Sequence, residues 1–297
     1  MSEQLRFDGR VAVVTGAGRG LGRAYAHLLA SRGAAVVVND LGGSMAGEGT
    51  DAGPAATVAA EITDAGGTAV PDTSDVSTDA GARALVRAAV EGFGRVDALV
   101  ANAGIMRWAR FPDVPTDDLD AHLAVHVAGS FHPARAAWPH MVEQGHGRIV
   151  LTTSTGMLGL PGNTAYGIAK GGVIGLARSL ALAGRTHGIA VNCIAPAAST
   201  RMAGEGGPEM PPDQVAPMVA YLAHDACPVS GEIYTAGAGR FARLFIGSTP
   251  GWVDEAGAPT VEDVATHWGA INDEAGYAVP ADLMDWSAQF LAHLDGG

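Results

Sequence analysis

Tyr166 and Lys170 are four residues apart in a stretch with helical periodicity. At this spacing the two side chains project from one face of a helix. A phenol, with an ordinary pKa of about 10, is a poor base at neutral pH, but an adjacent ammonium stabilises the phenolate. The pair therefore predicts a general acid/base, Tyr166, with Lys170 as its activator. The alternative is an ordinary surface pair on a helix.

Residues 15–22, Thr-Gly-Ala-Gly-Arg-Gly-Leu-Gly, separate a strand-like run from a helix-like run. Glycines allow the backbone to turn tightly and approach a pyrophosphate, and a helix N-terminus offers free N–H groups and a positive dipole end. The spacing fits TGxxxGxG and not GxGxxG. We expect a dinucleotide-binding turn and not merely a tight turn, with contacts from Gly16, Arg19, Gly20 and Leu21.

Asp40 follows the next strand-like run, about twenty residues after the turn, where a carboxylate can accept hydrogen bonds from ribose hydroxyls. The same charge repels a 2′-phosphate, which favours NAD over NADP. Arg19 is the competing signal, because an arginine in the turn can neutralise that phosphate. The other alternative for Asp40 is a turn-forming aspartate.

The elements that position these residues alternate between short β-branched runs and longer alanine-rich runs. This alternation predicts an α/β fold with a doubly wound, mostly parallel, Rossmann-like sheet buried on both faces. Pro133 and Pro139 predict a kink or restart in the fourth helix. The expected strands include residues 11–15, 34–39, 98–101, 148–152, 190–194 and 232–235, and the expected helices cover 21–31, 55–65, 80–92, 116–141 and 165–187.

The alternation stops near residue 243, so residues 1–244 are expected to form a single domain and 245–297 a C-terminal helical extension. The extension is too short to bury its apolar residues alone, so it should pack on the core or on a partner subunit. These residues are Trp252, Trp268, Ile271, Tyr277, Leu283, Trp286, Phe290 and Leu291.

Composition limits the partners. A net charge of −13 disfavours nucleic acid and favours a small-molecule substrate. Cys193 and Cys227 have no metal-ligand spacing, and His122 and His126 lack the glutamate of HExxH, so no metal is expected. There is no signal peptide and no apolar run of about 18 residues, so we expect no membrane association and a cytoplasmic protein.

Three further segments complete a family pattern: Asn102-Ala103-Gly104, the Tyr166/Lys170 pair and Pro196, which follows a strand. Together with TGxxxGxG they resemble the short-chain dehydrogenase/reductase family over about residues 6–240. The resemblance implies an oxidoreductase that interconverts a secondary alcohol and a ketone. It also implies cofactor contacts from the three segments, and a homodimer or homotetramer.

The family usually has a serine thirteen residues before the tyrosine to hold the substrate oxygen, and here that position is Thr153. The spacing of the following glycines favours Thr153, and Ser154 is the alternative. His126 is found where the family has an asparagine that relays protons. The resemblance therefore implies a catalytic role for His126, and the alternative is a histidine packed between helix and sheet.

Two other contacts follow from the resemblance: Asp75 and Val76 on the adenine, and Thr200 toward the nicotinamide amide. The alternatives are a turn aspartate and a mobile loop residue.

A narrower resemblance, carried by residues 36–43, 125–131, 134–138 and 194–196, is to the dehydrogenase part of peroxisomal multifunctional enzyme type 2 and its free-standing bacterial relatives. It implies a (3R)-hydroxyacyl-CoA dehydrogenase of fatty-acid or sterol side-chain breakdown. A 17β-hydroxysteroid or other alcohol dehydrogenase is the alternative, and a non-catalytic dinucleotide-binding sensor is a remote one. Candidate cations for CoA phosphates are Arg107, Arg110, Arg201, Arg240 and Arg243.

Overall fold

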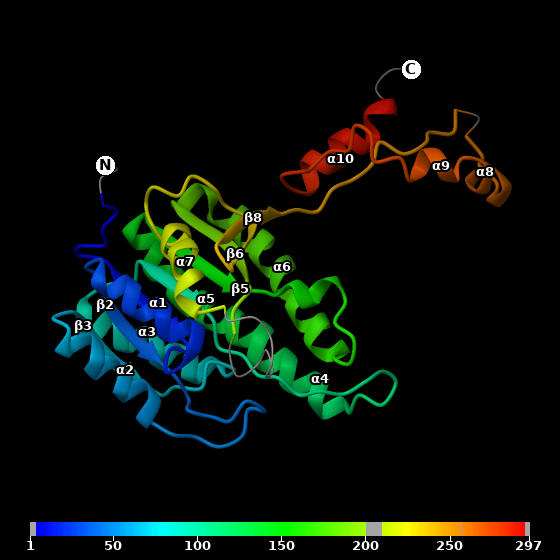
Figure 1. The fold of residues 1–297 in the computed structure, drawn as a ribbon. Helices are drawn as coiled ribbons and strands as arrows, with labels where there is room; N and C mark the ends of the chain where they lie inside the picture. Colours follow the sequence, from blue (N-terminus) through cyan, green and yellow to red (C-terminus); the bar gives the residue numbers. More distant parts are fainter. Residues whose placement is uncertain (1–3, 200–209, 256, 295–297) are drawn as a thin grey trace. The chain divides into compact units, whose positions relative to one another are not determined.

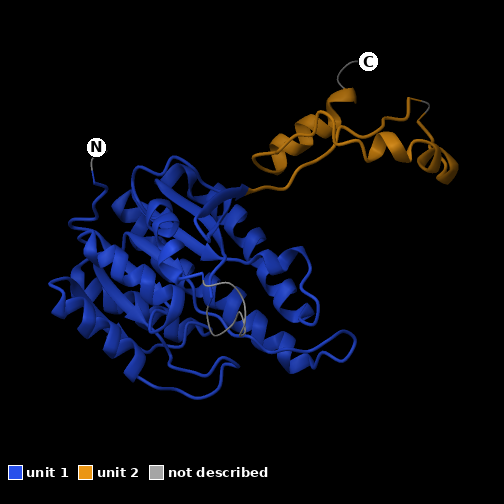
Figure 2. Cartoon of the chain, in the orientation of Figure 1, with its two compact units in different colours: residues 1–243 blue, residues 244–297 orange. Residues whose placement is uncertain are grey.

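The computed structural model describes residues 4–199, 210–255 and 257–294 (Figure 1). The chain divides into two compact units, Met1–Arg243 and Leu244–Gly297 (Figure 2). The first unit contains the sheet except Leu244 at its end, and every described residue of the predicted site. Each unit is described separately.

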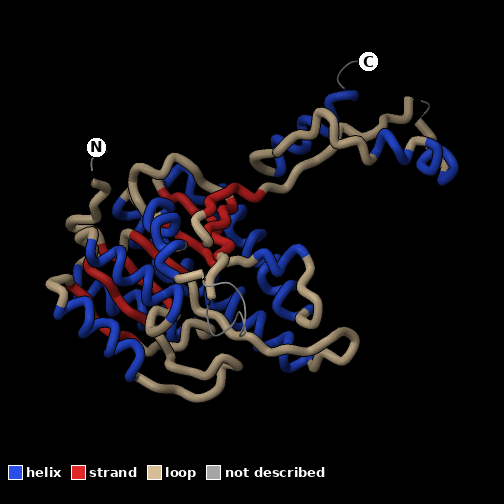
Figure 3. The backbone as a smooth tube through the Cα atoms, viewed as in Figure 1, coloured by secondary structure: helices blue, strands red, loops and turns tan. Residues whose placement is uncertain are grey.

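Eight strands form one sheet within the described residues, in the order β3-β2-β1-β4-β5-β6-β7-β8. Figure 3 draws the strands in red. Neighbouring strands from β3 to β7 pair in parallel. The chain builds the sheet outward from β1 in one direction and then from β4 in the other. This topology confirms the expected doubly wound, Rossmann-like α/β fold. The strands are β1 (Val11–Thr15), β2 (Ala35–Asn39), β3 (Thr68–Asp72), β4 (Ala98–Ala101), β5 (Gly147–Thr152), β6 (Ile189–Pro196), β7 (Ile233–Gly237) and β8 (Arg240–Leu244).

Burial explains the composition of the strands. Every residue of β1 and β4 is buried, as expected for central parallel strands that are covered by helices on both faces. The outer strand β3 is half-exposed and contains Pro71, which an edge strand tolerates because one of its sides needs no ladder hydrogen bonds. Two residues with positive φ, Ala238 and Gly239, turn the chain from β7 into β8.

Two layers of helices cover the sheet. Helices α1, α2 and α7 pack together on a core that includes Val14, Val38 and Val150 of the strands. Helices α3 and α5 pack against each other, and α6 lies against β6. The helices of the first unit are α1 (Gly20–Ser31), α2 (Gly53–Asp64), α3 (Asp79–Phe93), α4 (Thr116–His122), α5 (Gly129–Gln144), α6 (Thr164–Gly184) and α7 (Ala216–Leu222).

The predicted helix 116–141 is divided into α4, a π-helical turn at Leu123–Ala128 and α5. The helix restarts at Gly129, whose carbonyl is the one that a proline at position 133 leaves without its usual donor. Pro139 lies inside α5. The predicted interruption is therefore present, but it takes the form of a π turn upstream of both prolines, and this turn carries His126.

In its described residues the second unit contains three short α-helices, α8 (Val261–Thr266), α9 (Trp268–Ile271) and α10 (Leu283–Leu291), none of which buries a residue. Ring stacking joins its segments at Phe245 on Tyr277 and at Trp252 on His267, and Trp286 stacks on Phe290 within α10. Among the described residues of the whole chain, no helix is long and apolar enough to cross a membrane.

Candidate active site

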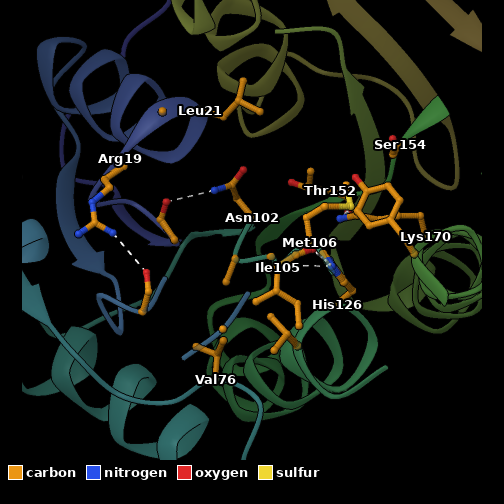
Figure 4. Close-up of a pocket in the computed structure, with 18 of the residues that line it drawn as sticks. Arg19, Leu21, Val76, Asn102, Ile105, Met106, His126, Thr152, Ser154 and Lys170 are labelled. Carbon is orange, nitrogen blue, oxygen red and sulfur yellow. Dashed lines mark hydrogen bonds between the residues drawn. The ribbon is translucent and has the colours of Figure 1, made fainter. Parts of the chain in front are cut away.

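A cavity of about 500 Å³ opens at the carboxyl ends of β1, β2, β4, β5 and β6, where ligands bind in open α/β folds. We call it the site cavity. Figure 4 shows Arg19 and Leu21 at one end and Thr152, Ser154 and Lys170 at the other. Every predicted site residue except Thr200 lines it; Thr200 lies outside the described residues. The residues that line it are Gly16, Arg19, Gly20, Leu21, Asp40, Asp75, Val76, Asn102, Ala103, Gly104, His126, Thr153, Tyr166, Lys170 and Pro196.

The site cavity also has a lining that sequence reasoning missed. Asn39 and Ser74 extend the polar end, whereas Ile105, Met106, Trp108 and Leu160 form an apolar wall. The loop after β2 adds Gly43, Ser44 and Gly47. No motif marks these positions, although residues 42–54 are rich in glycine and form a long loop, and such loops are uncommon unless they are functional or mobile.

The glycine turn leaves no room for side chains. A Cβ on Gly16, whose φ is 62°, would lie 2.8 Å from Cα of Ala103, and one on Gly18 would lie 2.6 Å from Cβ of Pro54. No side chain caps α1, so the N–H groups of its first turn remain available at the cavity. This bare, positively polarised helix end has the shape and charge that a dinucleotide pyrophosphate requires.

Asn102 fastens β4 to the glycine turn. Its Nδ2 donates to the carbonyl oxygens of Thr15 (3.1 Å) and Gly16 (3.3 Å). The hydroxyl of Thr15 in turn accepts from the N–H groups of Asn102 (2.9 Å) and Ala103 (3.0 Å). The turn and the end of β4 therefore form one rigid edge of the site cavity.

Asp40 ties two segments together. Its Oδ2 accepts from the N–H of Gly18 (2.8 Å) and its Oδ1 from the N–H of Gly42 (2.7 Å). Arg19 donates from Nη1 to the carbonyl oxygen of Gly43 at 3.4 Å (Figure 4). The carboxylate of Asp40 is thus held at the cavity wall. The guanidinium of Arg19, which could neutralise a 2′-phosphate, donates to the main chain instead.

Asp75 builds a turn. Its Oδ1 accepts from the N–H (2.9 Å) and the hydroxyl (2.7 Å) of Ser77, while the neighbouring Val76 is buried. Asp75 and Val76 both line the site cavity, and the buried side chain of Val76 contributes an apolar surface there (Figure 4).

Tyr166 and Lys170 are both buried on α6, whose first turn is capped by Asn163: its Oδ1 accepts from the N–H of Tyr166 at 3.1 Å. The Nζ of Lys170 lies 5.6 Å from the centre of the Tyr166 ring and donates to the carbonyl oxygen of Thr152 at 2.7 Å. Burial lowers the pKa of Lys170 to about 7. Burial also raises the pKa of Tyr166, against the opposing effect of a hydrogen bond with the Ser154 side chain.

These directions differ from the simple expectation that Lys170 depresses the phenol's pKa. The reason is that both groups are enclosed in a low-dielectric environment, which favours the neutral form of each. A phenolate in this place therefore depends on a protonated Lys170 beside it.

Thr153 and Ser154 point in different directions. The hydroxyl of Thr153, which is 1% exposed, donates to the carbonyl oxygen of Lys170 at 2.7 Å. The hydroxyl of Ser154 accepts from the N–H of Gly156 at 3.0 Å and forms the hydrogen bond that acts on Tyr166. Of the two neighbouring hydroxyls, that of Ser154 therefore contacts the phenol, and that of Thr153, which also lines the site cavity, contacts the main chain of Lys170.

His126 is fully buried beneath the site. Its Nε2 lies 2.9 Å from the carbonyl oxygen of Ile105 (Figure 4), and its ring packs edge-on against Tyr166 and stacks on His122. Burial and the nearby Lys170 lower the pKa of His126 well below its usual range, so the ring is neutral. A Cβ on Gly104 would lie 2.7 Å from its Cε1, which explains the glycine there. These contacts hold the ring between the π turn and the loop after β4, where it also lines the site cavity.

A model of short chain dehydrogenases matches residues 10–209. The chain belongs to the short-chain dehydrogenase/reductase family. It is 44% identical over 273 residues to a Mycobacterium tuberculosis protein named as a short-chain type dehydrogenase/reductase, with 90% of this chain and 95% of that protein covered. It is 43% identical over 293 residues to mouse peroxisomal multifunctional enzyme type 2. That match covers 96% of this chain but only 40% of the mouse protein.

A solved structure, the full-length peroxisomal multifunctional enzyme type 2 of Drosophila melanogaster, superposes with a TM-score of 0.82 at 33% identity, over 98% of this chain and 50% of that one. The short-chain dehydrogenase/reductase family consists of oxidoreductases that typically bind a nicotinamide dinucleotide. The bare glycine turn and the uncapped α1 suit such a cofactor. No group of three or more potential metal-ligating side chains occurs among the residues that the structure describes.

Proposed function

We propose that this short-chain dehydrogenase/reductase is an NAD-dependent enzyme that interconverts a secondary alcohol and a ketone. One observation carries the proposal: Ser154, Tyr166 and Lys170 line one end of the site cavity, and the glycine turn with Asp40 lines the other. A single cavity is thus lined both by groups that could act on an alcohol and by the turn that could hold a dinucleotide.

In the oxidation direction, the phenolic oxygen of Tyr166 takes the proton of the substrate hydroxyl, while the hydroxyl of Ser154 holds the substrate oxygen by a hydrogen bond. A nicotinamide dinucleotide held by the glycine turn and Asp40 would supply the acceptor for the hydride that leaves the alcohol carbon. Protonated Lys170 stabilises the phenolate. The carbonyl oxygen of Thr152 accepts a hydrogen bond from the Nζ of Lys170 and so orients the Lys170 side chain. In the reduction direction Tyr166 returns the proton to the carbonyl oxygen. Thr153 and His126 support this arrangement through packing and main-chain contacts.

The preference for NAD over NADP follows from charge. A 2′-phosphate at the ribose would meet the carboxylate of Asp40, which two backbone N–H groups hold in place. The one cation of the turn, Arg19, is turned to the Gly43 carbonyl. Specificity constants measured with NAD and NADP on the same substrate test this assignment, and a wild type that prefers NADP would refute it.

For the substrate we propose a (3R)-hydroxyacyl-CoA, supported by the similarity to peroxisomal multifunctional enzyme type 2. The apolar wall of Met106, Trp108 and Leu160 suits an acyl chain. Two of the candidate arginines have other partners: Arg107 binds Asp118, and Arg243 binds Glu232. Arg201 lies outside the described residues, which leaves Arg110 and Arg240 as cations for the CoA phosphates.

The second candidate is a 17β-hydroxysteroid or other alcohol dehydrogenase, because the same apolar wall suits a fused ring system. A panel of acyl-CoA and steroid alcohols, followed by NADH absorbance and scored by specificity constant, separates the two. Absence of turnover on every alcohol, with cofactor binding retained, would favour a dinucleotide-binding sensor.

We further propose a cytoplasmic homodimer or homotetramer without nucleic-acid or membrane partners. The second unit would pack on the first unit of the same or another subunit, because its exposed Trp268, Leu283 and Phe290 need a covering surface. Light scattering of the purified chain measures the oligomeric state.

A further inference from the structure

The loop between β2 and α2 is a compact strap over the site cavity. We define the strap as residues 42–51 (Figure 1, blue, between β2 and α2). Its base is closed, because the N–H of Asp51 donates to the carbonyl oxygen of Leu41 at 3.0 Å. Within it, the N–H of Ser44 donates to the carbonyl oxygen of Glu48 at 2.8 Å. The ends meet and the interior is bonded, as in an Ω-loop.

The tip of the strap docks on the loop that follows β4. The carbonyl oxygen of Met45 accepts from the N–H of Met106 at 2.9 Å. Gly47, whose φ is 85°, packs so closely that a Cβ there would lie 2.9 Å from Cγ2 of Ile105. The tip is therefore fitted against residues 105–106 and does not project freely into solvent.

The strap forms part of the wall of the site cavity. Its Gly43, Ser44 and Gly47 line the cavity, as do Asp40 and Met106. A dinucleotide bound in the cavity would therefore lie beside the strap. The position of the strap therefore bears directly on how the cofactor enters and leaves.

Arg107 anchors the strap through its side chain. Its Nε donates to the carbonyl oxygen of Ala46 at 2.8 Å, and its Nη1 lies 3.2 Å from Oδ1 of Asp118 on α4. The main chain of Arg107 has separate partners: its N–H donates to His122, and its carbonyl accepts from Asn163, the cap of the catalytic helix. Truncating the side chain thus removes this anchor of the strap and leaves in place the contacts that position Tyr166.

We propose that Arg107 is a positioning residue that holds the strap closed over the bound dinucleotide, so that cofactor release requires this anchor to break. The inference rests on the proposed function, since it assumes that the site cavity binds a nicotinamide dinucleotide. The guanidinium of Arg107 binds both Ala46 and Asp118 through charge-assisted hydrogen bonds, which are the stronger class of hydrogen bond. Asp118 in turn fixes the direction of the guanidinium.

The test is the rate at which NADH leaves the protein, followed by stopped-flow fluorescence with excess NAD as the trap. Arg107→Ala should release NADH about tenfold faster, as expected for the loss of one charge-assisted hydrogen bond. Asp118→Asn should increase the NADH release rate by less. Arg107→Lys, which keeps a cationic donor, should release NADH more slowly than Arg107→Ala. The matched control is Arg87→Ala, the same change at an exposed position of α3, which should leave the rate unaltered.

A second readout separates this role from damage to the catalytic centre. Because the main-chain contacts of residue 107 remain, the pH profile of turnover in Arg107→Ala should match the wild type. A release rate within twofold of wild type would overturn the proposal, and so would a shifted pH profile.

If Arg107→Ala fails to fold, Asp118→Asn and Gly47→Ala decide the question. The added Cβ of Gly47→Ala pushes the tip away from Ile105, so it should also accelerate release, and unchanged release in both variants would overturn the proposal. A wild type that binds neither NADH nor NADPH would instead refute the proposed function.

Discussion

Lys170 donates its Nζ to the carbonyl oxygen of Thr152 at 2.7 Å, in a fully enclosed position where burial lowers its pKa to about 7. The group that must stabilise a phenolate is therefore close to its titration point at neutral pH.

The first prediction concerns stability and pH. Because the folded pKa of Lys170 is lowered from its ordinary 10.5 to about 7, the unfolded chain binds more protons between these values, and the contribution of Lys170 to stability rises with pH across this window. The free energy of unfolding of the wild type, relative to Lys170→Met, should increase by roughly 2 kcal/mol from pH 7 to pH 9. Urea denaturation at several pH values measures it. A difference that stays flat would mean that Lys170 keeps an ordinary pKa.

The second prediction separates the two neighbouring hydroxyls. Ser154→Ala should lower kcat/KM by about 10² to 10³, as for other lost donors to a reacting oxygen. Thr153→Val removes a hydroxyl that serves the Lys170 carbonyl, and should mainly cost about 1 kcal/mol of stability. Steady-state kinetics and thermal unfolding of both variants provide the comparison. The opposite order of activities would assign the role to Thr153.

The third prediction is that Tyr166→Phe loses about 10² to 10⁴ in kcat because it removes the proton-transferring oxygen. Binding of NADH, titrated by fluorescence, should stay within a few-fold of wild type, since the ring and its packing on His126 remain. Near-normal turnover would exclude Tyr166 as the acid/base.

The fourth prediction is that Asp40→Ala narrows the preference for NAD over NADP at least about tenfold, which corresponds to roughly 1.4 kcal/mol. The reason is loss of the charge that opposes a 2′-phosphate. Asp64→Ala, the same change at an exposed position near the end of α2, is the control. If both substitutions narrow the preference for NAD equally, the effect comes from the net charge of the protein and not from the position of Asp40.

The fifth prediction concerns the second unit. Truncation after Phe245 retains all eight strands and should leave NADH binding intact. If the second unit encloses the distal part of the substrate, KM for bulky acyl-CoA or steroid alcohols should rise sharply, whereas KM for a small secondary alcohol should not. Unchanged kcat and KM on every substrate would mean that the second unit takes no part in substrate binding.

Much of the architecture was accessible from local pattern. Parallel strands buried on both faces require continuous apolar runs, and β1 and β4 have them. The glycine turn, Asp40 and the Tyr166/Lys170 pair could be recognised because their roles depend on short-range spacing along one turn, one strand end or one helix. Their gathering at a single edge follows from the parallel sheet, so it too could be predicted.

Other features depend on contacts between segments that are distant in the chain. The backbone after β5 directs the hydroxyl of Thr153 to the carbonyl of Lys170 and that of Ser154 to Tyr166. The spacing of residues along the chain does not predict these side-chain directions. The strap is fastened by Arg107, about sixty residues further along, through a side chain that composition alone would place in solvent. The directions of the pKa shifts of Tyr166 and Lys170 likewise depend on how completely the fold removes water from both groups, because desolvation is a property of the packed molecule and not of the residue type.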